Sequence, residues 1–217
     1  MDKQAILKTL EKVKTGSPAR KFTQTIDLIV NLRDINIKRA EEQVDIYTDL
    51  PYSRDKPVKI CGLVDKQLLE AAKTHFDLAI DKEEFDKYTD KSFRKIAAQY
   101  DYFVAQVTIM PLVAKTFGKV LGKKGKVPNP KAGCVVPPTA DLKAVRAKLQ
   151  KQVHLKAKIE PSIKCAIGDE KMDAEKVAEN AFQVYNRLKT ALPREENNIK
   201  DVRLKVTMGP AVKVDKA

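Results

Sequence analysis

The sequence predicts an α/β (α+β) protein of two domains, in which the middle of the chain is inserted into a domain built from both chain ends. The 217 residues suit two domains of about 100 residues each, because domains most often contain roughly 100–150 residues. Apolar and polar residues alternate near both ends of the chain, which is typical of half-buried strands. The middle instead contains short apolar runs separated by helical segments.

The first 55 residues predict one helix and two strands. The helix is expected to end before Gly16-Ser17-Pro18, and strands are expected in FTQTIDLIVNL (residues 22–32) and from Val44 to Leu50. A helix and two strands are too small to be stable alone, so they must join elements from elsewhere in the chain. The apolar residues that share one face of the helix are Ile6, Leu7, Leu10 and Val13.

From Val58 the pattern changes. Apolar runs that suit strands and helices follow one another in VKICGLV, LLEAAK, SFRKIAAQY and DYFVAQVTI. Such alternation predicts a small three-layer α/β domain. Thr139 is expected to cap a helix that extends through Leu149.

After residue 152 the period-two pattern returns in VHLKAKI and SIKCAIG, with a hairpin turn expected near Glu160-Pro161. Asp173 is the expected cap of a long helix that stops at Pro193. The final strand, from Val202 to Met208, has one apolar and one polar face and therefore needs a sheet to join. We expect residues 1–55 and 153–217 to share one sheet in one domain, and residues 56–152 to form the inserted domain.

The charge balance favours a polyanionic partner. The chain has 42 Lys and Arg against 29 Asp and Glu, a formal net charge of +13, and nucleic acid is the leading candidate because counterion release drives such binding. Residues 56–152 alone carry 19 basic and 10 acidic side chains. The alternative is that the excess of lysine only keeps the surface solvated.

Other features argue against membranes, cofactors and catalysis. No apolar run reaches the roughly 18 residues that a membrane span requires, and the N-terminus does not resemble a signal peptide. Cys61, Cys134 and Cys165 are far apart and lack zinc spacing, which suits buried thiols in a reducing cytoplasm. His75 and His154 form no recognisable triad or metal pattern. We therefore expect no catalytic residues, no metal and no cofactor.

The most basic stretch is MPLVAKTFGKVLGKKGKVPNPKAGCVVPP, which has no acidic residue. Met110-Pro111 can open a helix, and the later glycines are expected to let the backbone turn or approach a partner closely. The stretch is not a P-loop, because the spacing GxxxxGK[ST] fails and Val127 replaces the metal-binding hydroxyl. Its lysines are Lys115, Lys119, Lys123, Lys124, Lys126 and Lys131.

A KH-type clamp is a second interpretation of this stretch. VLGKKGKV matches the GXXG loop that grips single-stranded nucleic acid, but that loop must connect two helices. Pro128 and Pro130 follow at once and oppose a second helix.

The run MPLVAKTFGKVLGKKGKVPNPKAG resembles the signature of the L-one family of large-subunit ribosomal proteins, with Lys123 at a usual proline and Cys134 at a frequent threonine. KFTQTID (residues 21–27) is similar to the family's KFxETVE, with Gln24 and Asp27 in place of two glutamates. SIKCAIG is similar to a third stretch, and VTMGPAVKV (residues 206–214) matches the family's TTMGPAVRV. The matches occur in the family's order in all three thirds of the chain.

The resemblance, to the archaeal type of the family, implies a split α/β sandwich made from both chain ends and an inserted Rossmann-like domain. It implies a structural, non-enzymatic protein of the cytoplasmic ribosome that binds large-subunit ribosomal RNA and forms the mobile stalk near the tRNA exit site. Exit-site tRNA, whose release it would help, and its own messenger RNA, which it would repress, are the further partners implied. The free protein is expected to be a monomer. The alternatives are an enzyme acting on nucleotides or RNA and a free-standing messenger-RNA regulator.

The family's RNA contacts lie mainly in the domain made from both ends. The inserted domain would then use its lysine-rich stretch as a secondary basic loop. Carried over by position, the expected RNA-binding residues are Lys21, Phe22, Thr25, Asp27, Lys164, Thr207, Met208, Gly209 and Pro210.

Overall fold

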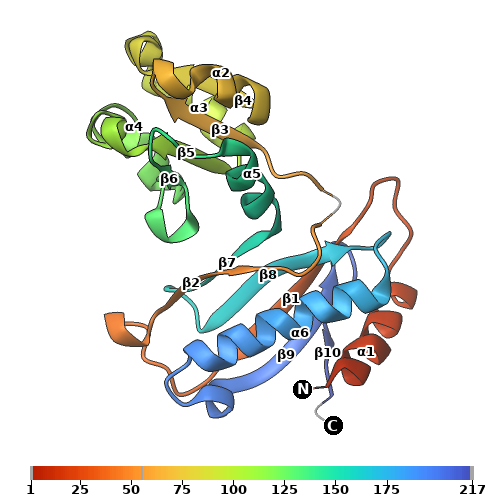
Figure 1. The fold of residues 1–217 in the computed structure, drawn as a ribbon. Helices are drawn as coiled ribbons and strands as arrows, with labels where there is room; N and C mark the ends of the chain where they lie inside the picture. Colours follow the sequence, from red (N-terminus) through yellow and green to blue (C-terminus); the bar gives the residue numbers. More distant parts are fainter. Residues whose placement is uncertain (1, 55, 216–217) are drawn as a thin grey trace. The chain divides into compact units, whose positions relative to one another are not determined.

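The computed structural model describes residues 2–54 and 56–215, in which helices and strands alternate along the chain (Figure 1). The predicted α/β class is confirmed. The chain divides into two compact units. We call Met1–Lys56 together with Lys151–Ala217 the split unit, and Pro57–Gln150 the inserted unit.

A four-stranded antiparallel sheet joins both chain ends in the split unit. The strand from the N-terminal segment lies between two strands from the C-terminal third. The final long strand, which has one apolar and one polar face, thus joins a sheet as expected. The strand order is β10-β9-β1-β8. The bounds are β1 (Thr25–Leu32), β8 (Ser162–Asp169), β9 (Ile199–Val206) and β10 (Val212–Lys213).

Helices α1 (Lys3–Thr15) and α6 (Ala174–Ala191) cover one face of this sheet (Figure 1). Ile26, Leu28 and Val30 point into that core and are fully buried, while the intervening residues of β1 are only half-buried. We call the side of the sheet opposite these helices the open face. It carries Thr25, Asp27, Ile29 and Asn31 of β1, Lys164 and Ala166 of β8, and Arg203 and Lys205 of β9.

The predicted helix ends are confirmed. Helix α1 stops at Thr15, before Gly16, and α6 stops at Ala191, before Pro193. The Asp173 carboxylate caps α6 by accepting a hydrogen bond from the Glu175 amide at 3.3 Å.

The expected hairpin near Glu160-Pro161 is wrong. Strands β2 (Val44–Asp49) and β7 (Gln152–Ala157) form a separate antiparallel pair, and β8 pairs with β1 instead of β7. The Pro161 carbonyl accepts from the Leu32 amide at 2.7 Å. The turn therefore leads the chain from the β2-β7 pair to the four-stranded sheet.

A parallel sheet of order β4-β3-β5-β6 forms the centre of the inserted unit. Its strands are β3 (Ile60–Val64), β4 (Leu78–Asp81), β5 (Tyr102–Gln106) and β6 (Val135–Val136). Its helices are α2 (Lys66–His75), α3 (Asp90–Gln99), α4 (Met110–Lys124) and α5 (Leu142–Lys151). The 3-10 turns are η1 (Ala40–Glu42) and η5 (Glu195–Asn198) in the split unit, and η2 (Lys82–Lys87), η3 (Val107–Ile109) and η4 (Pro130–Ala132) in the inserted unit.

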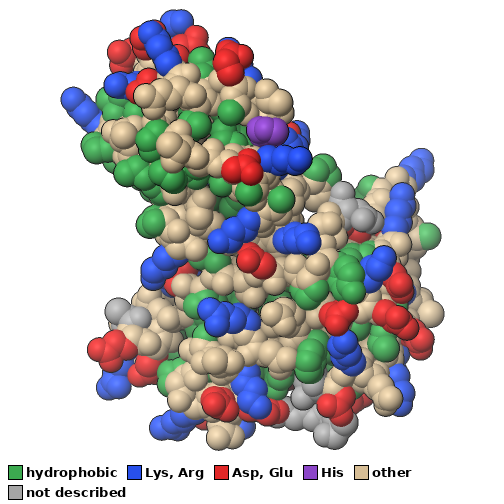
Figure 2. Space-filling view, in the orientation of Figure 1, with side chains coloured by type: hydrophobic (Ala, Val, Ile, Leu, Met, Phe, Trp, Pro, Cys, Tyr) green, Lys and Arg blue, Asp and Glu red, His purple; other side chains and the backbone are tan. Residues whose placement is uncertain are grey.

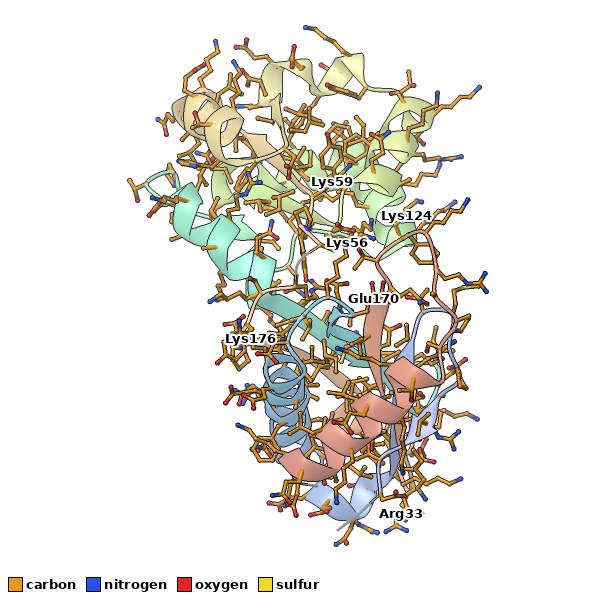
Figure 3. All side chains as sticks on the ribbon, turned by 90° about the vertical axis from the view of Figure 1, so that its right-hand side faces the viewer. Arg33, Lys56, Lys59, Lys124, Glu170 and Lys176 are labelled. Carbon is orange, nitrogen blue, oxygen red and sulfur yellow. The ribbon has the colours of Figure 1, made fainter. Side chains whose placement is uncertain are left out.

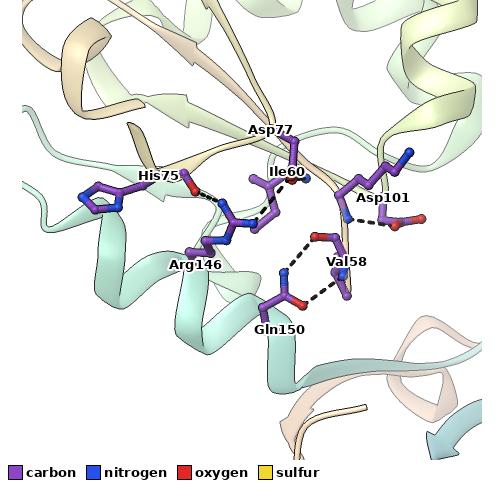
Figure 4. Close-up of polar contacts among 8 residues, drawn as sticks. Val58, Ile60, His75, Asp77, Asp101, Arg146 and Gln150 are labelled. Atoms are coloured by element: carbon purple, nitrogen blue, oxygen red, sulfur yellow. Dashed lines mark hydrogen bonds and ion pairs between the residues drawn. The ribbon is translucent and has the colours of Figure 1, made fainter. Parts of the chain in front are cut away.

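Aromatic packing and polar bonds hold the inserted unit together. The rings of Phe93 and Phe117 stack with their centroids 3.8 Å apart. On α5, Arg146 donates to the His75 carbonyl and forms an ion pair with Asp77 at 3.5 Å (Figure 4). The cap of α5 is Asp141, which accepts from the Lys143 amide at 2.9 Å, rather than the expected Thr139. Thr139 lies too far before the first helical residue to cap it.

The three cysteines are buried, as predicted. Burial raises the thiol pKa to about 12 for Cys61, about 11 for Cys134 and about 12 for Cys165. Among the described residues, no helix is both long and apolar enough to span a membrane, and no cluster of three or more metal-binding side chains is found.

Asn180 should be a main stabilising residue of the split unit. Its fully buried amide bonds to the amide and carbonyl of Tyr52 and to the Ile167 carbonyl, at 2.8–3.1 Å. We expect Asn180→Ala to lower the free energy of unfolding by about 2–3 kcal/mol, because the amide and carbonyl of Tyr52 and the Ile167 carbonyl lose their hydrogen-bond partner. Gln183→Ala, on the exposed side of α6, is the control and should leave the thermal melting temperature nearly unchanged.

Candidate nucleic-acid interface

The structure brings the predicted residues at the two chain ends together at one end of the sheet. The Thr207 amide donates to the Thr25 carbonyl at 3.1 Å. The Thr207 hydroxyl donates to the same carbonyl at 3.2 Å and accepts from the Thr25 amide at 3.1 Å. Residues 207–210, which we call the terminal turn, are therefore fixed beside the start of β1. We call the predicted set Lys21, Phe22, Thr25, Asp27, Lys164 and residues 207–210 the predicted RNA face.

Two large apolar side chains of the predicted RNA face are exposed. Phe22 is 52% exposed and Met208 is 51% exposed. An isolated aromatic residue belongs to the core by default, but Phe22 does not pack there. An exposed phenyl ring can instead stack on a base or lie against a ribose.

Asp27 brings a partly desolvated carboxylate to the open face. Burial raises its pKa above the ordinary value, while the positive charges of Lys205 and Arg54 lower it and the charge of Asp169 raises it further. Asp27 lies opposite Lys205 on β9 and Ala166 on β8. A carboxylate in this position can accept a hydrogen bond from a 2′-hydroxyl or a base amino group.

The open face also carries basic residues beyond those predicted for RNA binding. Lys164 and Arg203 lie on either side of Ile29, and Lys213 on β10 lies opposite Arg203. Lys164 forms an exposed ion pair with Glu160 at 3.2 Å, which is weak enough to be exchanged for a phosphate. The sequence signal for Arg203 and Lys205 is their place on the polar side of the final strand.

Asp201 orients Arg203 on this face. Its carboxylate accepts from the Arg203 guanidinium at 2.9 Å and from the Asn31 side chain. Burial alone would raise the pKa of Asp201, but these two hydrogen bonds and the nearby positive charges lower it. On the side of the molecule that bears α6, acidic and basic side chains are interspersed (Figure 2).

Gln24 is a residue of this region that the sequence reasoning did not select. Its side chain is buried beneath the predicted RNA face and bonds to Met208, Pro18 and Glu170. Glu170 lies at the end of β8, and Arg33 lies at the opposite end of the sheet (Figure 3). No local pattern distinguishes such a residue, because two of its partners, Glu170 and Met208, are far from it in the sequence.

Gly209 has a packing role inside the protein. A Cβ atom at this position would lie 2.1 Å from the Ser17 hydroxyl oxygen. Ser17 is itself held by a hydrogen bond to the Val13 carbonyl at 2.7 Å. A close approach of RNA is therefore not needed to explain this glycine.

The secondary basic loop differs from the expectation at several points. Helix α4 continues through Lys124, so Gly118 and Gly122 lie inside it and do not turn the backbone. Gly125 and Gly133 do turn it, with φ of 64° and 73°. No helix follows Gly125 directly, which contradicts the KH interpretation.

Lys126 differs from the other lysines of the loop because it is partly buried and bonded to backbone carbonyls. Its ammonium group donates to the carbonyls of Ala97 and Tyr100, at 3.1 and 2.6 Å, and so caps α3. Lys126 therefore has a structural contact that the sequence did not predict. The other lysines of the loop are exposed: Lys115, Lys119, Lys123, Lys124 and Lys131.

Comparison with known proteins identifies the family. The model of the ribosomal protein L1p/L10e family matches residues 10–210. The chain belongs to this family. The large ribosomal subunit protein uL1 of Thermococcus kodakarensis is 37% identical over 218 residues, which cover 99% of each chain. The uL1 of Pyrococcus abyssi is 38% identical, over 98% of this chain and 96% of its own. The uL1 of Methanothermobacter thermautotrophicus is 37% identical, over 97% and 99%.

Membership of the L1p/L10e family confirms the resemblance stated from the motifs, including its archaeal type. It makes the chain a ribosomal protein of the large subunit. The relatives are ribosomal proteins, which are structural and not enzymes. The matches cover nearly the whole chain and therefore include both units.

The close contact between Gly209 and Ser17 predicts that a larger residue at position 209 destabilises the protein. We expect Gly209→Ala to destabilise the protein by roughly 1–3 kcal/mol, the usual effect of an overpacked site. Adding Ser17→Ala should recover part of this loss, since the nearest remaining side-chain atom of residue 17, its Cβ, lies 3.2 Å away. Thermal melting of the single and double variants provides the measurement, and equal melting temperatures for both would contradict the packing role.

Proposed function

We propose that this chain binds a folded segment of large-subunit ribosomal RNA through the split unit and thereby builds the mobile stalk near the tRNA exit site. The observation that carries the proposal is the predicted RNA face itself. Phe22 and Met208 are exposed apolar side chains near the start of β1. Along the open face from there, Asp27 lies opposite Lys205, and Lys164 and Arg203 follow on either side of Ile29.

The chemistry of this surface suits folded RNA. Phe22 would stack on a base or ribose, and Asp27 would accept from a 2′-hydroxyl, which DNA lacks. Lys164, Arg203 and Lys205 would neutralise phosphates and release counterions. Shape and sugar contacts would supply specificity, while the cations would supply affinity that depends on salt.

We infer a separate role for the inserted unit, in which its exposed lysines contact the backbone of exiting tRNA and help its release. The five free lysines of the basic loop lie on or just after α4, and no acid interrupts the sequence between Lys115 and Lys131. Such a surface recognises phosphates without sequence specificity.

Repression of the chain's own messenger RNA would use the split unit. A messenger segment that folds like the ribosomal site would present the same sugar and phosphate surface, so both RNAs would compete for the predicted RNA face. Competition between the two RNAs in an equilibrium binding assay tests this role.

The first test compares two double variants of the full chain that each remove two positive charges. Lys164→Ala with Lys205→Ala should weaken binding to a ribosomal RNA fragment and flatten the salt dependence by about one in log-log slope per lost phosphate contact. Lys123→Ala with Lys124→Ala should bind the same fragment almost normally. The reverse result would assign the RNA site to the inserted unit.

The second test separates RNA binding from nucleotide chemistry. We expect tight binding to the ribosomal RNA fragment, no saturable binding of ATP and no hydrolysis, because the glycine loop fails the P-loop spacing. Equilibrium binding and phosphate-release assays measure these quantities. In cell extracts the chain should co-sediment with large subunits, and its absence from them would overturn the proposed function.

A further inference from the structure

Gln24 is an unusual residue for its position, since it lies just before β1 and is only 1% exposed. Buried glutamines are uncommon, and they normally have partners for their polar atoms. Here the side-chain oxygen accepts from the Met208 amide at 3.1 Å. The side-chain nitrogen donates to the Pro18 carbonyl at 3.1 Å and to the Glu170 carboxylate at 3.4 Å.

These bonds join segments that carry the predicted RNA face. The bond to Pro18 closes the loop of residues 18–24, which holds Lys21 and Phe22. The bond to Met208 holds the terminal turn. The Gln24 carbonyl also accepts from the Glu170 amide at 2.9 Å, so the end of β8 is tied to the same residue.

We propose that Gln24 is the positioning residue of the predicted RNA face, which holds the Phe22 loop and the Met208 turn in the arrangement that contacts RNA. This role rests on the RNA binding proposed above. Gln24 is buried and contacts no RNA itself. It acts through the two exposed apolar side chains that its bonds place at one end of the sheet.

Only an amide satisfies all three partners. The Met208 amide needs an acceptor, whereas the Pro18 carbonyl and the Glu170 carboxylate need donors. A glutamate, which the family motif carries at this place, would set two carboxylates side by side unless residue 170 became a donor. Gln24 and Glu170 therefore form a matched pair in this chain.

The first experiment compares Gln24→Ala with Gln43→Ala. Gln43 forms a similar bond, donating to the Ile37 carbonyl at 2.9 Å in the connection between β1 and β2. We expect Gln24→Ala, which loses all three side-chain hydrogen bonds, to weaken RNA binding roughly 10-fold or more with an unchanged salt slope. Gln43→Ala, which loses one side-chain bond at a half-buried position, should lower the melting temperature by a smaller amount and leave RNA affinity unchanged.

Amide hydrogen exchange shows whether the change is local. In Gln24→Ala the Met208 amide should exchange faster, while the Thr207 amide, bonded to the Thr25 carbonyl, should stay protected. Gln24→Glu should also weaken RNA binding, because it places two carboxylates together and removes the donor to the Pro18 carbonyl. Adding Glu170→Gln should recover part of the loss, since residue 170 then donates to residue 24 while the Pro18 carbonyl still lacks a donor.

The outcomes separate the two proposals. If the unmodified chain fails to bind ribosomal RNA, the proposed function and the role of Gln24 both fail. If it binds and Gln24→Ala binds equally well despite faster exchange at Met208, only the positioning role is overturned. Equal loss of affinity in Gln43→Ala, or no recovery in the Gln24→Glu, Glu170→Gln variant, would also overturn that role.

Discussion

The pairing of β1 with both β8 and β9 is the constraint on which the rest of the split unit depends. Strand β1 begins 25 residues into the chain, yet its partners come from the last third. This pairing requires that the segment between them leave and return, so the inserted unit can form without interrupting the sheet. It also places the start of β1 beside the turn that follows β9, which is where the predicted RNA face lies.

The same pairing explains why the proposed RNA-binding surface lies on this side of the sheet. Helices α1 and α6 cover one side of the sheet, and the antiparallel register then aligns polar residues of three strands on the other. Basic side chains on β8 and β9 flank β1. The pKa of Asp27 is raised and the pKa of Asp201 is lowered, because the two carboxylates have different surroundings. Burial prevails at Asp27, and hydrogen bonds from Arg203 and Asn31 prevail at Asp201.

Several residues that look alike in the sequence have different tasks in the fold. The basic loop contains six lysines that cannot be told apart by composition. Lys126 caps α3, whereas the other five are exposed. Four glycines in the same stretch divide into two inside a helix and two at positive φ. Gly209, next to the exposed Met208, leaves room for Ser17. Composition indicates a nucleic-acid partner, but the roles of single residues depend on what packs against them.

Local patterns in the chain were sufficient for the class of fold, the ends of α1 and α6, the burial of the cysteines and the membership of the L1p/L10e family. These features depend on residues that are neighbours in sequence, through period-two or helical spacing, caps and breaks. The pairing partner of β7, the cap of α5 and the bonds of Gln24 depended on the assembled molecule. Gln24 and Met208 are separated by 184 positions, and only the closed sheet brings them within hydrogen-bonding distance.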